Sequence, residues 1–160
     1  YAVMGEYGCP FAATDFLSVD PAMAEFDEYA TPLDQFRELV GAVHARKGLM
    51  LVDLPANHTG WASTLQTHHP DWFHRQADGK FISPGAWGVT WADLVELDYS
   101  NPELRAYMAD VFLFWCRLGI AGFLHAQLYP AATAAQGKPC ALNVGVAGGG
   151  VRDKLNWYHE

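Results

Sequence analysis

Two stretches of the chain repeat apolar residues at helical spacing. The first runs from Thr31 to Lys47 and the second from Asn101 to Leu118, and each pattern predicts an amphipathic helix with one buried face. The apolar face of the first comprises Leu33, Phe36, Leu39, Val40 and Val43. That of the second comprises Leu104, Met108, Val111, Trp115 and Leu118, and Phe112 and Phe114 widen it.

Both predicted helices carry start and stop signals. Thr31 and Asn101 are residue types that cap a helix N-terminus, and a proline follows each at the first helical position. Gly48 and Gly119 are the residues we expect to end the two helices, because glycine readily adopts the left-handed conformation that follows many helices.

A short apolar run follows each helix and predicts a strand. Met50 to Val52 reads as a strand covered on both faces, and Ile120 to Ala126 reads as a second one. Pairing of the first strand should end near Pro55, which cannot donate to a ladder. Helices that alternate with strands are typical of α/β folds. On local pattern alone, an ordinary strand and turn explains Leu49 to Gly60 equally well.

Polar residues gather where the first strand ends. Asp53, Asn57 and His58 stand at its carboxyl end, which is where parallel sheets and barrels place ligand groups. The stretch VDLPANH resembles the first signature of the alpha-amylase family of glycoside hydrolases. Further stretches resemble that family in the same order, over roughly residues 5 to 129: CPFAATDF, HPDWF, LDYSNPEL and GIAGF.

The resemblance implies an α/β fold and a retaining mechanism on a (β/α)8 barrel. The two predicted strands would be the third and fourth, so residues 1–160 would form one partial TIM-barrel domain holding about strands 2 to 5. Residues 59–97, after the third strand, would form a long loop lobe whose tryptophans and phenylalanines supply area to bury. A fifth strand could run from Ala141 to Val146. Missing strands would leave exposed barrel edges, so we expect a fragment of a longer chain or self-association through those edges.

The resemblance also locates the catalytic positions. Retaining glycosidases use two carboxyl groups, one as nucleophile and one as acid/base. The family nucleophile position falls on Ala126 and the acid/base position on Val146, and neither side chain can do that chemistry. Asp53, Glu6 and Asp98 are acids that could stand in, although no spacing supports them. The sequence therefore predicts a hydrolase-like domain that is catalytically inactive.

Substrate and metal positions follow from the same resemblance. Phe11 stands where a family tyrosine stacks on a sugar ring, His58 where a histidine binds the sugar, and Asp53 where a carboxylate holds the site's hydrogen bonds. The alternatives are that Phe11 packs in the core and that backbone groups satisfy His58. Asn57 matches a family calcium ligand and Asp98 could match a second. Since Ca²⁺ takes about 6–8 oxygens, these residues make at most a partial site.

Charge and cysteine content exclude several other classes. The net charge of −8 argues against nucleic acid and against anionic membrane surfaces, and no apolar run has the length of a membrane span. The three cysteines, Cys9, Cys116 and Cys140, are widely spaced and favour a reducing compartment, hence the cytoplasm. His68, His69, His74 and His125 could be read as a zinc cluster, but the HPDWF resemblance explains that stretch without a metal.

Three hypotheses about function therefore stand. The chain could be an inactive hydrolase-like domain that still binds an α-glucan or α-glucoside. It could be a non-enzymatic interaction scaffold built on the same half-barrel. It could also be a truncated product without independent function, because a family resemblance predicts fold more safely than activity.

Overall fold

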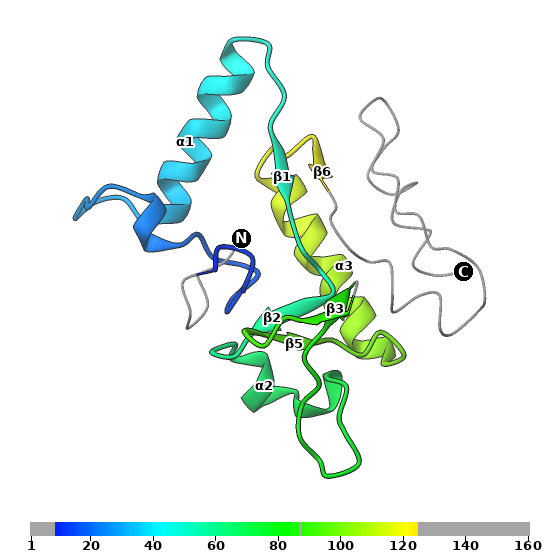
Figure 1. The fold of residues 1–160 in the computed structure, drawn as a ribbon. Helices are drawn as coiled ribbons and strands as arrows, with labels where there is room; N and C mark the ends of the chain where they lie inside the picture. The colour runs from blue at the N-terminus through cyan, green and yellow to red at the C-terminus, as the bar shows by residue number, and fades with distance from the viewer. Residues whose placement is uncertain (1–8, 87, 125–160) are drawn as a thin grey trace.

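The computed structural model describes residues 9–86 and 88–124. Two helices and two strands follow one another in the order helix–strand twice (Figure 1). They are α1 (Pro32–Ala45), β1 (Leu51–Asp53), α3 (Pro102–Arg117) and β6 (Gly122–Leu124). The predicted alternation of helix and strand is confirmed in this part of the chain.

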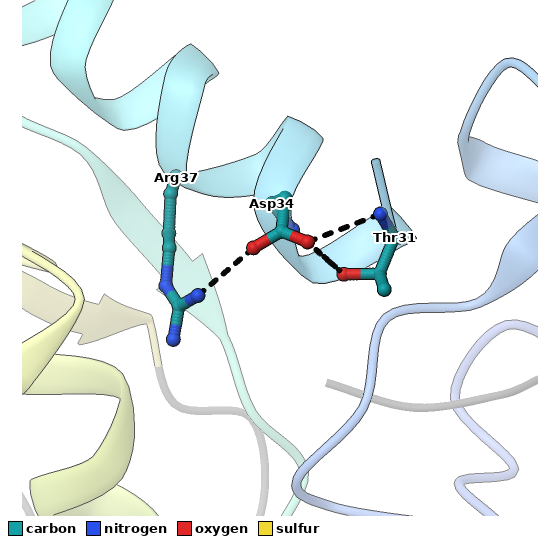
Figure 2. A network of polar contacts seen from close by, with 3 residues as sticks. All are labelled: Thr31, Asp34 and Arg37. Carbon is teal, nitrogen blue, oxygen red and sulfur yellow. Dashed lines mark hydrogen bonds and ion pairs between the residues drawn. The ribbon is translucent and has the colours of Figure 1, made fainter. Parts of the chain in front are cut away.

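Helix α1 begins as the sequence predicts. Thr31 and Asp34 form a capping box, in which each side chain bonds the other residue's backbone N–H (Figure 2). The hydrogen bond from the Thr31 side chain is the main reason that the pKa of Asp34 lies below its usual value. Arg37 adds an ion pair to Asp34 at 3.0 Å, so the charges of these two residues neutralise each other.

Two predictions about α1 are wrong. Leu39 is 53% exposed, so it belongs to the outer face, while Val40 is buried. The helix ends at Ala45, and Lys47, with φ of 60°, takes the left-handed conformation that the sequence assigned to Gly48. Gly48 is needed for a different reason: a Cβ there would lie 2.9 Å from Val43 Cγ1.

Helix α3 follows the prediction closely. The Asn101 side chain accepts hydrogen bonds from the N–H groups of the first turn, and the helix ends at Arg117 before Gly119, which has φ of 98°. The predicted face is fully buried at Leu104, Met108, Val111 and Trp115 and partly buried at Leu118.

Strands β1 and β6 pair in parallel. Leu51 lies opposite Gly122 and Asp53 opposite Leu124. This pairing joins the two strands that the sequence predicted. The expectation that β1 is covered on both faces is not met, since its three residues are only half-buried and β6 is the strand that pairs with it among residues 9–86 and 88–124.

The core joins the two helices to the sheet. Phe36 of α1 meets Trp115 of α3 edge-on at 5.4 Å, and Phe112 of α3 meets Phe123 of β6 at 4.8 Å. Trp115 also donates its indole N–H to the Phe16 carbonyl at 2.8 Å, which fixes the N-terminal loop to the core. A short 3₁₀ turn, Pro21–Met23, lies in the stretch between that loop and α1.

The segment after β1 forms a lobe of short elements (Figure 1). Strand β2 (His58–Gly60) pairs antiparallel with β5 (Leu94–Glu96), and β3 (Gly85–Ala86) pairs with β4 (Val89–Thr90). Helix α2 (Leu65–His68) and a 3₁₀ turn (Pro70–Trp72) lie between β2 and β3. The predicted tight turn at Asp78 and Gly79 is confirmed, because Gly79 has φ of 85° and a bridge joins Arg75 to Phe81.

Among the described residues, no helix combines the length and the apolar composition that crossing a bilayer requires.

Candidate functional site

The candidate site lies where β1 and β6 end. Asp53 is the last residue of β1 and lies opposite Leu124 in the parallel register. Its Oδ1 is buried and has no hydrogen-bond partner among residues 9–86 and 88–124. Ala126 and Val146, the positions assigned to the nucleophile and the acid/base, lie outside the described residues, as does Glu6.

His58 is buried at the start of β2. Its side chain is 2% exposed, and Nε2 lies 3.1 Å from the Phe11 carbonyl oxygen. Because a carbonyl only accepts, Nε2–H is the donor, which leaves Nδ1 of the neutral ring as a buried acceptor without a partner in the described part of the chain. Burial lowers the pKa of His58, while the Phe11 carbonyl and Asp93 oppose that shift. His58 therefore fits the backbone-satisfied alternative.

The loop that holds His58 is itself fixed by β2. Gly60 donates its N–H to the Ala13 carbonyl at 2.8 Å, and Ala12 and Ala13 are fully buried. A Cβ at Gly60 would lie only 2.7 Å from the Ala12 oxygen, so this close approach requires glycine. The Phe11 side chain is left 46% exposed, which excludes the alternative that it packs in the core.

Two carboxylates that the sequence did not single out flank His58. Glu96 is its partner in the antiparallel register of β2 and β5, so the two side chains share one face of the pair. Asp93 lies close enough to raise the pKa of His58. Their position depends on pairing between segments more than 30 residues apart, and nothing local in the sequence indicates it.

The two candidate calcium ligands differ in how they are engaged. Asn57 is 4% exposed and its Oδ1 has no hydrogen-bond partner in the described part of the chain, so it could hold a cation. Oδ1 of Asp98 accepts the Ser100 N–H at 2.9 Å, and it lies 3.7 Å from His74 Nε2. Burial raises the pKa of Asp98, but the bonds to Ser100 outweigh it and keep the pKa below its usual value. These two residues alone supply fewer than the roughly six to eight oxygens that Ca²⁺ takes, so they remain at most part of a calcium site.

The histidines of the lobe have separate partners. The His69 ring stacks on Trp72 with centroids 3.9 Å apart, while His74 faces Asp98. No group of three or more His, Cys, Asp or Glu side chains with metal-binding geometry occurs among the described residues. His125, the fourth histidine considered for such a cluster, lies outside the described residues.

Comparison with curated proteins finds amylases. An intracellular maltogenic amylase from Bacillus subtilis (strain 168) is 30% identical over 112 residues, which is 64% of this chain and 18% of that protein. The chain thus spans less than a fifth of the length of that relative. No protein-family profile matches the chain.

Comparison with solved structures finds the same class of fold. An alpha-amylase from Lactobacillus plantarum is 31% identical with a TM-score of 0.63, covering 78% of this chain and 27% of that one. A noncanonic maltogenic alpha-amylase from Thermotoga neapolitana is 30% identical with a TM-score of 0.64, covering 80% of this chain and 28% of that one.

Proposed function

Since this chain belongs to the alpha-amylase family of glycoside hydrolases over the part that the comparisons align, we propose that it is a non-hydrolysing member that retains an α-glucan-binding face. In this proposal β1 and β6 are the third and fourth strands of a partial barrel. Their parallel pairing supports that assignment.

The absence of a catalytic pair carries the proposal. A retaining mechanism needs two carboxyl groups about 5–5.5 Å apart at the strand ends. Within the described residues, the carboxyl end of β1 and β6 carries Asp53 opposite Leu124, and the sequence continues with His125 and Ala126 where the family has its nucleophile. A methyl group cannot attack an anomeric carbon, so we propose that this face binds without cleaving.

Phe11 supplies the surface that a glucan would use. Its side chain is 46% exposed, and the hydrogen bond from His58 to its carbonyl oxygen fixes the backbone from which the ring projects. Apolar sugar faces stack on such rings. Asp53 has a buried carboxylate oxygen that lacks a partner in the described chain, so it is a second candidate acceptor for sugar hydroxyl groups. His58 would act through Phe11, because its Nε2 donates to the Phe11 carbonyl oxygen.

Isothermal titration with maltoheptaose tests the binding. We expect a dissociation constant on the order of 1 mM, which corresponds to about 4 kcal/mol of binding free energy. Phe11→Ser should abolish the heat, while Tyr29→Ser, at another exposed aromatic (89% exposed), should retain it. No heat with the unmodified chain, or equal loss in both variants, would contradict the proposal.

A separate observation supports the hypothesis of an interaction scaffold. Helix α1 presents an outer face with exposed apolar side chains, including Leu39, that no element in the described chain covers. A protein interface there would be independent of glucan binding.

A further inference from the structure

The outer face of α1 combines a groove lined by acidic and apolar side chains with a basic end. The groove, of about 460 Å³, lies between the loop before α1 and the helix, and it is lined by Glu25, Phe26, Asp27, Gln35, Glu38, Leu39 and Ala42. Phe26 is 97% exposed and Leu39 is 53% exposed. Exposed apolar side chains gathered in a groove indicate an interaction surface.

The groove is preformed, because the loop is tied to the helix. The Gln35 side chain accepts the Glu25 N–H at 3.0 Å and donates to the Glu25 carbonyl at 2.7 Å. Asp27 accepts the Tyr29 N–H at 2.7 Å, which closes the next turn of the loop. A partner would therefore meet a fixed surface and would not have to order the loop.

The charges along this face change sign from one end of the helix to the other. Glu25, Asp27 and Glu38 make no ion pair among the described residues, whereas Asp34 is neutralised by Arg37. At the opposite end, Arg46 and Lys47 follow the last turn. The Arg46 guanidinium donates to the Ala42 carbonyl at 2.9 Å, which holds it against the outer face.

The basic end also carries an exposed apolar residue. Leu49, two residues after Lys47, is 65% exposed. The face thus holds a groove with acidic and apolar lining. The C-terminal end of the helix holds two basic residues and an exposed leucine, which would suit such a groove. One copy of the chain therefore contains both halves of a complementary contact.

We propose that two copies of this chain associate through the outer faces of their α1 helices, antiparallel about a two-fold axis beside Ala42. In that register Glu38 of one copy faces Arg46 of the other, and Leu39 faces Ala45, each pair occurring twice. Such a self-complementary contact is the commonest way in which soluble chains form dimers. Ala42 is small and exposed, so the two helix axes can approach closely at the crossing point.

This surface differs from the barrel edges that the sequence suggested for self-association. A second copy fits the groove better than a nucleic acid, because phosphates would meet carboxylates there. A neutral glucan has no charges that could pair with the acidic and basic residues along the helix.

Sedimentation velocity over a range of protein concentrations tests the proposal. The unmodified chain should form a dimer, and Glu38→Lys and Arg46→Glu should each weaken the dimer about tenfold or more, since each creates two like-charge contacts per dimer. The double variant carrying both changes should restore dimerisation, because the pairs re-form with reversed sign. Asp110→Lys, an equal charge change at an exposed position on α3, should leave the dimer unchanged.

Each other outcome overturns the proposal. A chain that stays monomeric at all concentrations, a dimer that both single variants leave intact, or a double variant that does not recover would each do so. Far-ultraviolet circular dichroism of every variant checks the fold, and the recovery of the double variant cannot arise from unfolding. Glucan binding is scored separately, so a failure here leaves the proposed function untouched.

Discussion

At the candidate site, burial affects His58 more strongly than nearby charges do. His58 is fully enclosed and bonds the Phe11 carbonyl, so its ring orders the loop that presents Phe11. Burial disfavours the protonated ring and lowers the pKa of His58, although the Phe11 carbonyl and Asp93 partly offset this effect. The stability of the fold therefore depends on the protonation state of this residue.

Acidification should destabilise the chain through His58. Its pKa in the folded chain lies below the unfolded value of about 6.5, so the unfolded state binds more protons between the two values. The stabilisation is present above the unfolded pKa and is lost as the pH falls through the folded pKa. Urea unfolding between about pH 8 and pH 5 should show this loss. It should be absent in His58→Gln and present in His44→Gln, at an exposed histidine.

Replacing Gly60 and Gly41 by alanine should change the free energy of unfolding in opposite directions. A Cβ at Gly60 would clash with the Ala12 oxygen at 2.7 Å, so Gly60→Ala should lower the free energy of unfolding by about 1–3 kcal/mol. A Cβ at Gly41, inside α1, meets nothing within 4 Å, so Gly41→Ala should raise it by about 0.5–1 kcal/mol. Urea unfolding measures both, and destabilisation of equal size would refute the close approach at Gly60.

At the scale of elements, local signals predict the helices well. Thr31 and Asn101 cap their helices as expected, because capping depends on residues within three positions of each other. The predicted buried face of α1 was too wide because it included Leu39. An apolar residue at the border of the buried face can lie on either side of that border. The helix end was misplaced because Lys47 adopts the left-handed conformation that glycine usually takes.

Elements that depend on pairing between distant segments were not predicted from the sequence. Strand β2 is short and polar, with no alternation to mark it, and its partner β5 begins more than 30 residues later. Asp93 and Glu96 reach His58 only through that pairing, so no local pattern could single them out. The strand end at Asp53 was predictable, because Pro55 cannot continue a ladder.

Removing the cap of α1 should weaken the whole chain, since the helix packs on α3. Thr31→Ala deletes the hydroxyl that accepts the Asp34 N–H, and we expect a loss of about 1 kcal/mol in the free energy of unfolding. Thr64→Ala is the matched control, because Thr64 stands at the N-cap of α2 without a side-chain capping bond. A larger loss at Thr64 than at Thr31 in chemical unfolding would disprove the assigned role.

At the scale of the whole molecule, the chain is an amylase-type α/β arrangement that spans a small share of its relatives. Its aligned part is 18% of the maltogenic amylase from Bacillus subtilis. The parallel pair β1–β6, the half-buried state of β1 and the exposed face of α1 are what we expect of part of a larger fold or of an assembly. In the proposed assignment, the catalytic positions of the family fall on Ala126 and Val146.

The release of reducing sugar from maltoheptaose by the purified chain tests this account most directly. We predict release indistinguishable from a buffer blank over long incubation, because in the proposed assignment Ala126 and Val146 replace the two catalytic carboxylates. Turnover above the blank that disappears in Asp53→Asn, or in Asp93→Asn or Glu96→Gln beside His58, would contradict the account and identify the carboxylate that performs the chemistry.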